Sequence, residues 1–221
     1  MAISKLNFNS LNVTPSANLA IGFDSGADDL ETSSGGGAIK FIKKLTASSS
    51  STLSFVDGSA SVVLDSTYKK YMFIFNNIHP ASADANLQVN FSIDAGSNYN
   101  VTKTTSFFRT QHGESGSGAE LGYEASLDLA QGTAVKKISQ TSGADNDQGI
   151  SGILHLFNPS STTFVKHFIS QTNVSYAYSE PYAYSSYTAG YANTTSAVDA
   201  VQFSINSGNM DTGTITLYGI T

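Results

Sequence analysis

The sequence contains no cysteine, which excludes disulfide bridges and thiolate chemistry. Charged residues are also scarce, at 13% of 221 residues against a usual share of about 25%. The formal net charge of −6 disfavours non-specific binding to nucleic acid or to an anionic membrane, because proteins that bind these are basic. A surface made polar by Ser, Thr, Asn and Gln suits sheets and protein–protein packing more than exposed, charge-rich helices.

Long apolar segments are missing as well. The N-terminal stretch MAISKLNFNS lacks the apolar region of a signal peptide. No run approaches the roughly 18 apolar residues of a membrane helix. We therefore expect a soluble protein that is made without a secretory signal. Its apolar residues, 40% of the chain with 13 Phe and 11 Tyr, suffice for the core of one domain.

What the sequence has in quantity is apolar residues at every second position. In Val198–Ile220, two such runs, Val201–Ile205 and Thr214–Tyr218, flank a turn whose residues tolerate positive φ. Alternation with period two is typical of a strand with one buried and one wet face. This stretch predicts a β-hairpin, and we expect its last strand, Gly213–Gly219, to lie inside a sheet.

Alternating or continuous apolar runs recur along the chain, and no helical period persists. Further strands are expected at Ala38–Thr46, Thr52–Val56, Ser61–Leu64, Tyr71–Phe75, Leu87–Ile93, Tyr99–Phe108, Tyr123–Leu129, Val135–Ile138, Gly149–Phe157 and Thr163–Gln171. The continuous run Tyr71–Phe75 predicts a strand buried on both faces, and the polar stretches Thr110–Gly122 and Thr141–Gly149 predict loops. We therefore predict an all-β fold, a jelly-roll-like antiparallel β-sandwich of residues 38–221 with an extended N-terminal arm.

Residues 1–37 differ in composition from the rest. They contain few large apolar residues and many Asn, Ser, Gly and Asp, and they close with Ser33-Ser34-Gly35-Gly36-Gly37, which predicts a flexible joint. Their apolar residues are spaced too irregularly for a helix. We interpret this stretch as an extended arm able to dock on a neighbouring subunit, with a loosely ordered tail as the alternative.

Several segments carry a resemblance through their order in the chain. They are Tyr68–Tyr71 with the strand that ends Asn77–Pro80, then Leu87–Tyr99, Gly152–Pro159 and Gly213–Ile220, within a region from Phe41 to Ile220. This arrangement resembles β-sandwich virion structural proteins of tailed bacteriophages, of the head-decoration, fibre or tail-associated type. The resemblance implies a structural protein of the virion that is made in the host cytoplasm and binds another capsid or tail protein. It implies no particular position on the particle.

Tyrosine is concentrated in one part of the chain. Six of the 11 tyrosines fall between positions 176 and 191, namely Tyr176, Tyr178, Tyr182, Tyr184, Tyr187 and Tyr191. Tyrosine offers a large contact area, a polar tip and little rotamer entropy to lose. These residues are candidate interface or glycan contacts. They predict a tyrosine-lined face or long loop packed in the domain or against a neighbouring subunit, a glycan-binding platform, or a mobile loop.

The sequence contains no recognisable catalytic or metal-binding motif. The four histidines lack metal-ligand spacing, and His155 and His167 are expected to pack against each other across a hairpin. Asp145-Asn146-Asp147 does not fit a calcium loop and is interpreted as solvated carboxylates. Gly113–Gly118 (GESGSG) departs from the nucleophile motif that it approaches. We therefore predict no catalytic residue, no cofactor and no metal site, and a protein that is not an enzyme; a polysaccharide depolymerase has the least support.

The functional expectation is a bacteriophage structural protein that acts by protein–protein binding. Its expected partners are copies of itself and another capsid or tail protein, with no nucleic acid and no membrane. A homo-oligomer is expected because the surface carries little charge to keep copies apart, and a trimer is expected by analogy with phage fibres and spikes. The alternative function is a receptor- or glycan-binding module of the particle that uses the tyrosine-rich stretch 176–191.

Overall fold

The computed structural model describes residues 20–23, 30–33, 38–177 and 181–221. The chain divides into two compact units, Met1–Ala38 and Ile39–Thr221. In the first unit, β1 (Ala20–Phe23) and β2 (Leu30–Ser33) pair as an antiparallel two-stranded sheet. Most other residues of the expected N-terminal arm, the glycine joint included, lie outside the described residues, so the arm stays a prediction.

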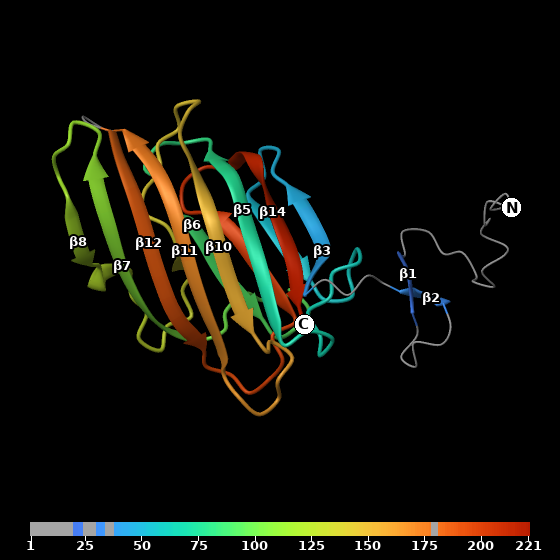
Figure 1. The fold of residues 1–221 in the computed structure, drawn as a ribbon. Helices are drawn as coiled ribbons and strands as arrows, with labels where there is room; N and C mark the ends of the chain where they lie inside the picture. The colour runs from blue at the N-terminus through green and yellow to red at the C-terminus, as the bar shows by residue number, and fades with distance from the viewer. Residues whose placement is uncertain (1–19, 24–29, 34–37, 178–180) are drawn as a thin grey trace, which may run out of the picture. The chain divides into compact units, whose positions relative to one another are not determined.

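The second unit consists of two antiparallel sheets packed as a sandwich, with the larger sheet in front in Figure 1. The larger sheet has eight strands in the order β3-β14-β5-β10-β11-β12-β7-β8, and the smaller has four in the order β4-β13-β6-β9. The larger sheet contains β3 (Ile39–Thr46), β5 (Lys70–Pro80), β7 (Lys103–Gly113), β8 (Glu120–Tyr123), β10 (Gly149–Phe157), β11 (Lys166–Ala177), β12 (Pro181–Ala192) and β14 (Met210–Ile220). The smaller contains β4 (Thr52–Val56), β6 (Leu87–Ser92), β9 (Lys136–Lys137) and β13 (Ala200–Ile205), and a short 3-10 helix, η2 (Ala125–Leu127), follows β8.

The predicted β-sandwich is thereby confirmed. Between β3 and β14 the chain passes from one sheet to the other eight times, and it stays in the larger sheet only from β7 to β8 and from β10 through β11 to β12. Such crossings suit the predicted jelly roll, which stays an interpretation of this order. Two strand pairs, β7–β8 and β11–β12, extend the larger sheet without adding to the smaller one. Among the described residues, no helix has the length and apolar character needed to cross a membrane.

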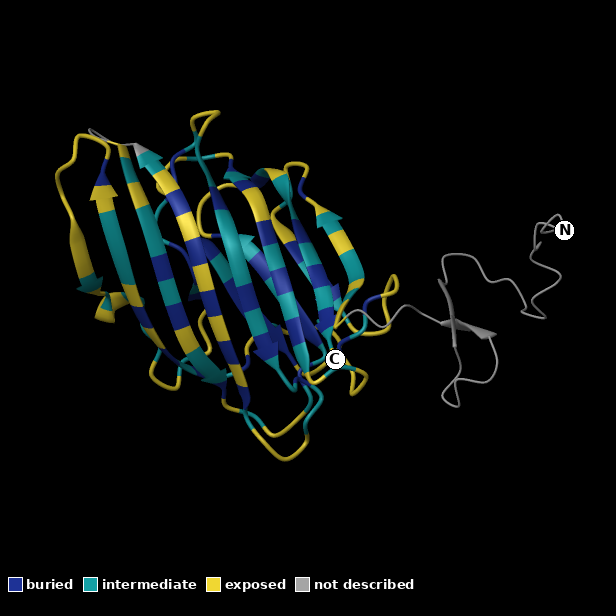
Figure 2. Cartoon of the chain, in the orientation of Figure 1, coloured by how far each residue is buried: buried dark blue, intermediate teal, exposed yellow. Residues whose placement is uncertain are grey.

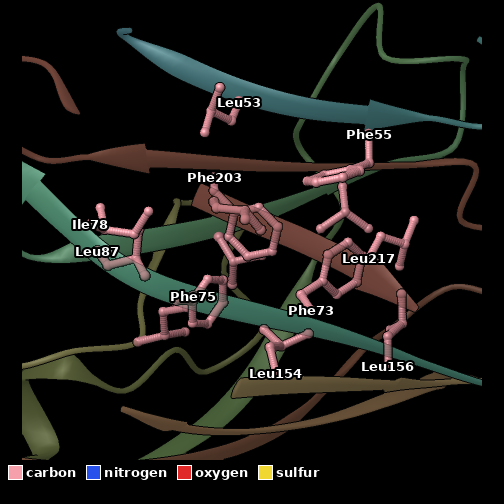
Figure 3. Packing of buried hydrophobic residues seen from close by; sticks show 14 of the residues in the cluster. Leu53, Phe55, Phe73, Phe75, Ile78, Leu87, Leu154, Leu156, Phe203 and Leu217 are labelled. Carbon is pink, nitrogen blue, oxygen red and sulfur yellow. The ribbon is translucent and has the colours of Figure 1, made fainter. Parts of the chain in front are cut away.

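Alternate side chains of the two sheets meet in one hydrophobic core (Figure 3). Phe203 on β13 contacts aromatic rings from both layers. Its ring centroid lies 5.2 Å from that of Phe73 and 5.1 Å from that of Phe75, both on β5. On its own sheet it lies 6.3 Å from Phe55. All three contacts are edge-on, a geometry that adds roughly 0.5–1.5 kcal/mol per pair beyond the burial of area.

The hairpin predicted for Val198–Ile220 is wrong. β13 belongs to the smaller sheet and β14 to the larger, so the residues between them cross the sandwich. Alternation identified both strands, but it does not tell which strand lies beside which. The expectation that the last strand lies inside a sheet is confirmed, because β14 pairs with β3 on one side and with β5 on the other.

Of the other local predictions, some are confirmed and others are wrong. Antiparallel pairing of β10 with β11 confirms the hairpin predicted around Asn158-Pro159. Ser61–Leu64, predicted as a strand, is a turn followed by irregular backbone. Thr110–Gly122, predicted as a loop, contains the end of β7 and most of β8, whereas Tyr123–Leu129, predicted as a strand, contains η2. Whether these segments form strands depends on the presence of a neighbouring strand to pair with more than on their local composition.

Leu217→Asp is expected to unfold the domain. The Leu217 side chain is fully buried, and its strand is paired on both sides. An unpaired buried carboxylate costs several kcal/mol, a large part of a typical domain stability of about 5–15 kcal/mol. Circular dichroism and thermal melting measure the effect. The matched control is Thr216→Asp on the opposite face of the same strand, which should retain a cooperative transition. A native β spectrum with an unchanged melting temperature for Leu217→Asp would show that this strand is misplaced.

Candidate functional site

The larger sheet has two faces, and the smaller sheet covers only one of them. The covered face supplies fully buried core residues such as Phe73, Leu154 and Phe168. The opposite face, called the outer face below, carries the side chains that alternate with these; exposed and buried positions alternate along its strands in Figure 2. Its large apolar and aromatic residues are exposed or half-buried, and they are Ile39, Phe41, Met72, Ile74, Phe108, Leu121, Tyr123, Ile153, Phe157, Ile169, Tyr187, Tyr191, Tyr218 and Ile220.

The run Tyr71–Phe75 shows how the outer face arises from the sequence. Alternate side chains of this run, those of Tyr71 and Phe73 among them, are buried. The intervening Met72 and Ile74 are only half-buried and lie on the outer face. The prediction that this strand is buried on both faces is therefore wrong. A strand that is apolar at every position belongs to a sheet with two apolar faces, and only one of them is covered by the described residues.

Aromatic contacts order the side chains of the outer face. The rings of Phe108 and Tyr187 are stacked, with centroids 4.8 Å apart and planes 8° apart. The ring of His167 meets that of Tyr191 edge-on at 6.0 Å. Ile169 lies between these pairs on β11 and is 52% exposed. Rings that are already packed have little side-chain freedom left to lose on binding.

The middle of the outer face carries almost no formal charge. Along β10, β11, β12 and β7 its titratable side chains other than tyrosine are His112, His155 and His167. Burial, and to a smaller extent the charge of Lys70, lowers the pKa of His155, so this ring is neutral at pH 7. His155 pairs in register with Ile169, so the expected direct pair of His155 with His167 is not formed. Depletion of charge together with aromatic residues is typical of interface cores.

A shallow hollow of about 540 Å³ lies on the outer face over β7, β12 and β11. Small side chains form its floor, among them those of Ser106 and Ala189. His167, Ile169 and Tyr191 rise beside it. The hollow therefore exists because small residues occupy the middle of this sheet between larger ones, and its walls offer apolar and aromatic contacts.

The sheet divides the tyrosine-rich stretch between its two sides. Tyr187 and Tyr191 lie on the outer face, at odd-numbered positions of β12. Tyr182 and Tyr184, at even-numbered positions, lie on the opposite side, where Tyr176 pairs in register with Tyr182. Tyr178 lies outside the described residues. The structure therefore does not bring these residues together as one platform.

The tyrosine rings on the inner side pack against other residues of the domain. The centroid of Tyr184 lies 5.8 Å from that of Tyr182 and 6.4 Å from that of Tyr176. The guanidinium of Arg109 lies 5.7 Å from the Tyr184 ring, and burial raises the pKa of the Tyr184 hydroxyl. The hydroxyl of Tyr176 donates to the carboxylate of Asp84 at 2.8 Å. These three tyrosines pack the end of the sheet, whereas Tyr187 and Tyr191 face outward.

A second hollow, of about 430 Å³, is lined mainly by polar side chains at the end of β5, β10 and β11. The loop Asp145-Asn146-Asp147 borders it, and these three residues are exposed, as expected for solvated carboxylates. The Nε2 atom of His79 lies 3.1 Å from the carbonyl oxygen of Asp145. No group of three or more metal-ligating side chains occurs among the described residues.

Three lysine side chains, those of Lys103, Lys136 and Lys166, are fully buried. The Lys103 ammonium donates to Asn90 Oδ1 at 2.6 Å and to the carbonyl of Val101 at 2.7 Å. Lys136 donates to the carbonyl of Leu127 at the end of η2, and Lys166 donates to the carbonyls of two loop residues. Burial lowers the pKa of Lys103 and of Lys136 to about 8, and it lowers the pKa of Lys166. Perturbed amines are candidates for chemistry, but these fasten loops to strands beneath the sheet.

The buried lysines predict that stability rises as the pH is raised above about 8. The folded state holds fewer protons than the unfolded state between the lowered pKa and the ordinary lysine value of about 10.4, so the free energy of unfolding increases across that interval. Above about pH 10 the buried Tyr71, whose pKa burial raises, acts in the opposite direction. Thermal melting between about pH 7.5 and 9.5 should show a rising melting temperature.

In Lys103→Met this rise should be smaller, because one of the groups that releases its proton in the folded state is gone. The exposed lysine variant Lys69→Met is the matched control and should keep the full rise. A melting temperature that falls across this interval in the unmodified chain would contradict the assignment of these side chains as buried amines with lowered pKa values.

The outer face was not identified from the sequence, although a signal for it was present. Apolar side chains occupy consecutive positions in β5 and in β10, which a half-wet strand does not need. Comparisons of this chain with protein-family models, with curated proteins and with solved structures found no match.

Proposed function

We propose that this protein is a structural component of a bacteriophage particle and acts by binding other proteins. The observation that supports the proposal most strongly is the outer face of the larger sheet. It presents exposed apolar residues from one edge of the sheet to the other, such as Phe41 on β3, Ile169 on β11 and Leu121 on β8. Large exposed apolar and aromatic side chains gathered on one face of a sheet are typical of a protein–protein interaction site.

The chemistry of the outer face suits a protein partner. Its middle is nearly uncharged, it is rich in Tyr, Phe and Ile, and its rings are held by their neighbours. Large side chains that are already ordered give up little entropy on binding, so the burial of their area contributes more of its free energy to affinity. The proposed partners are copies of the chain and another capsid or tail protein, and the proposed location is the virion. Binding rather than catalysis is the proposed work.

Ile169→Lys is expected to reduce incorporation into the particle about tenfold or more, because it places a charge in the middle of an apolar interface. The isolated domain should melt at nearly the same temperature, since Ile169 is 52% exposed. Quantitative mass spectrometry of purified particles of the phage that encodes the chain gives the copy number per particle. Thr52→Lys, at an exposed position on β4 of the smaller sheet, is the matched control. Particles that infect normally and lack the unmodified chain would overturn the proposed function.

A receptor- or glycan-binding role is the second candidate, and the hollow beside Tyr191 favours it. Aromatic rings such as Tyr191 stack on the apolar faces of sugars, and the neighbouring Thr104 and Ser106 carry hydroxyl groups for hydrogen bonds. This candidate uses only the outward-facing part of the tyrosine-rich stretch. It is compatible with a place in the virion.

Tyr191→Ala should weaken binding to the recognised glycan about tenfold while the fold is retained, because it removes the stacking surface beside the hollow. A glycan array with the purified protein finds the ligand, and calorimetry measures the loss. Tyr218→Ala, on the outer face but away from the hollow, is the control. The absence of any glycan bound by the unmodified chain would remove this candidate.

A further inference from the structure

The larger sheet ends in two edge strands, β3 and β8. Among the described residues, β3 pairs only with β14 and β8 pairs only with β7. The outward side of an edge strand presents backbone N–H and C=O groups in the plane of the sheet, which can be extended by a strand of another chain. Whether an edge accepts a given strand depends on its side chains.

The two edges carry opposite charge. β3 contains Lys40, Lys43 and Lys44 and no carboxylate. β8 contains Glu120 and no basic residue, and Glu124 follows it. Lysines on an edge strand normally prevent pairing with another copy of the same strand, because like charges meet. Here the opposite edge of the same sheet carries the complementary charge.

Arg109 on β7 contacts both carboxylates near β8. It lies 3.3 Å from Glu120 and also pairs with Glu124. The Glu120 side chain is nevertheless 50% exposed, so its carboxylate remains accessible to a cation from outside. One guanidinium shared by two carboxylates leaves this edge with excess negative charge.

Apolar side chains flank the charges on both edges. On β3, Phe41 is 64% exposed and its ring meets Tyr218 edge-on at 6.0 Å. On β8, Leu121 and Tyr123 are 72% and 63% exposed. All of these side chains lie on the outer face. Cross-strand pairs of aromatic and aliphatic residues contribute roughly 0.2–1 kcal/mol each, so an edge-to-edge contact would join two apolar faces into one.

Strand direction allows the two edges to meet. Every neighbouring pair in the larger sheet is antiparallel, and the sheet has eight strands, so β3 and β8 run in opposite directions. Two copies placed side by side in the same orientation therefore bring β8 of one copy antiparallel to β3 of the next. The outer faces of both copies then lie on the same side.

We propose that copies of this chain associate head to tail by pairing the acidic edge strand β8 of one copy with the basic edge strand β3 of the next. This inference rests on the proposed function, since it names one of its partners and the surface that binds it. The contact joins different surfaces, so repetition gives a closed ring or an open array and not a two-fold dimer. Pairing of β3 with β3 brings lysines together, and pairing of β8 with β8 brings carboxylates together.

Charge reversal with mixing tests the proposal. Lys43→Glu/Lys44→Glu makes both edges acidic, and Glu120→Lys makes both edges basic. Each variant alone should lose self-association by about tenfold or more, because every edge contact now joins like charges. An equal mixture of the two should recover it, with copies alternating. Sedimentation velocity of the unmodified chain, each variant and the mixture at tens of micromolar and low salt measures the result.

Two further variants keep the test decisive. Leu121→Lys cancels the excess negative charge of the β8 edge without removing a partner of Arg109, so it should also weaken self-association and replaces Glu120→Lys if the latter folds poorly. Lys69→Glu reverses an exposed lysine in the turn before β5 and should associate as the unmodified chain does. Circular dichroism establishes that each variant retains its β structure.

A monomeric unmodified chain under these conditions, or folded variants that associate as well as it does, would overturn the edge proposal. So would a mixture that stays as dissociated as its components. Incorporation of the reversed variants into particles at the normal copy number would overturn it too, yet leave the proposed structural role standing. Absence of the unmodified chain from particles would instead count against the structural role.

Discussion

A sheet of eight strands has two faces, and within the described part of the chain a four-stranded sheet covers only one of them. The difference between the covered and the uncovered face of the larger sheet explains where its apolar residues lie. The covered face forms the core around Phe203, where rings from both layers meet edge-on. The other face keeps apolar residues at its surface, including Phe41 and Ile169. Because burial of apolar area is the main source of favourable free energy in association, these exposed residues support the proposal that a partner covers this face.

The larger sheet is extended by β11, β12, β7 and β8, and the inner side of these strands must also be packed against other residues. The segment that follows β8 lies against this side and is held there by hydrogen bonds. Thr172 donates to the carbonyl of Ile138 at 2.8 Å, and the backbone N–H of Gln140 donates to Ser186 Oγ at 2.9 Å. Buried polar groups satisfied in this way hold the segment in one position. The buried Lys136 helps to hold the same segment, since its ammonium donates to a backbone carbonyl in it.

Much of the fold could be predicted from the sequence because alternation records which side chains enter a core. It located β13 and β14 and the hairpin of β10 with β11. It could not assign β13 and β14 to different sheets, since partner choice depends on contacts that are distant in sequence. The outer face was missed because a continuous apolar run such as Tyr71–Phe75 looks the same whether its second face is buried or exposed. The tyrosine-rich stretch was identified by composition, but only the register of β12 separates Tyr187 from Tyr184.

We propose that the outer face of the larger sheet is an interaction surface. A cryo-electron microscopy map of the particle that contains this protein, at a resolution that shows side chains, tests it most directly. We expect protein density to cover the outer face, with Ile169 and the stacked rings of Phe108 and Tyr187 in the contact. An outer face that is open to solvent in every copy, with the particle held together through the smaller sheet, would contradict it.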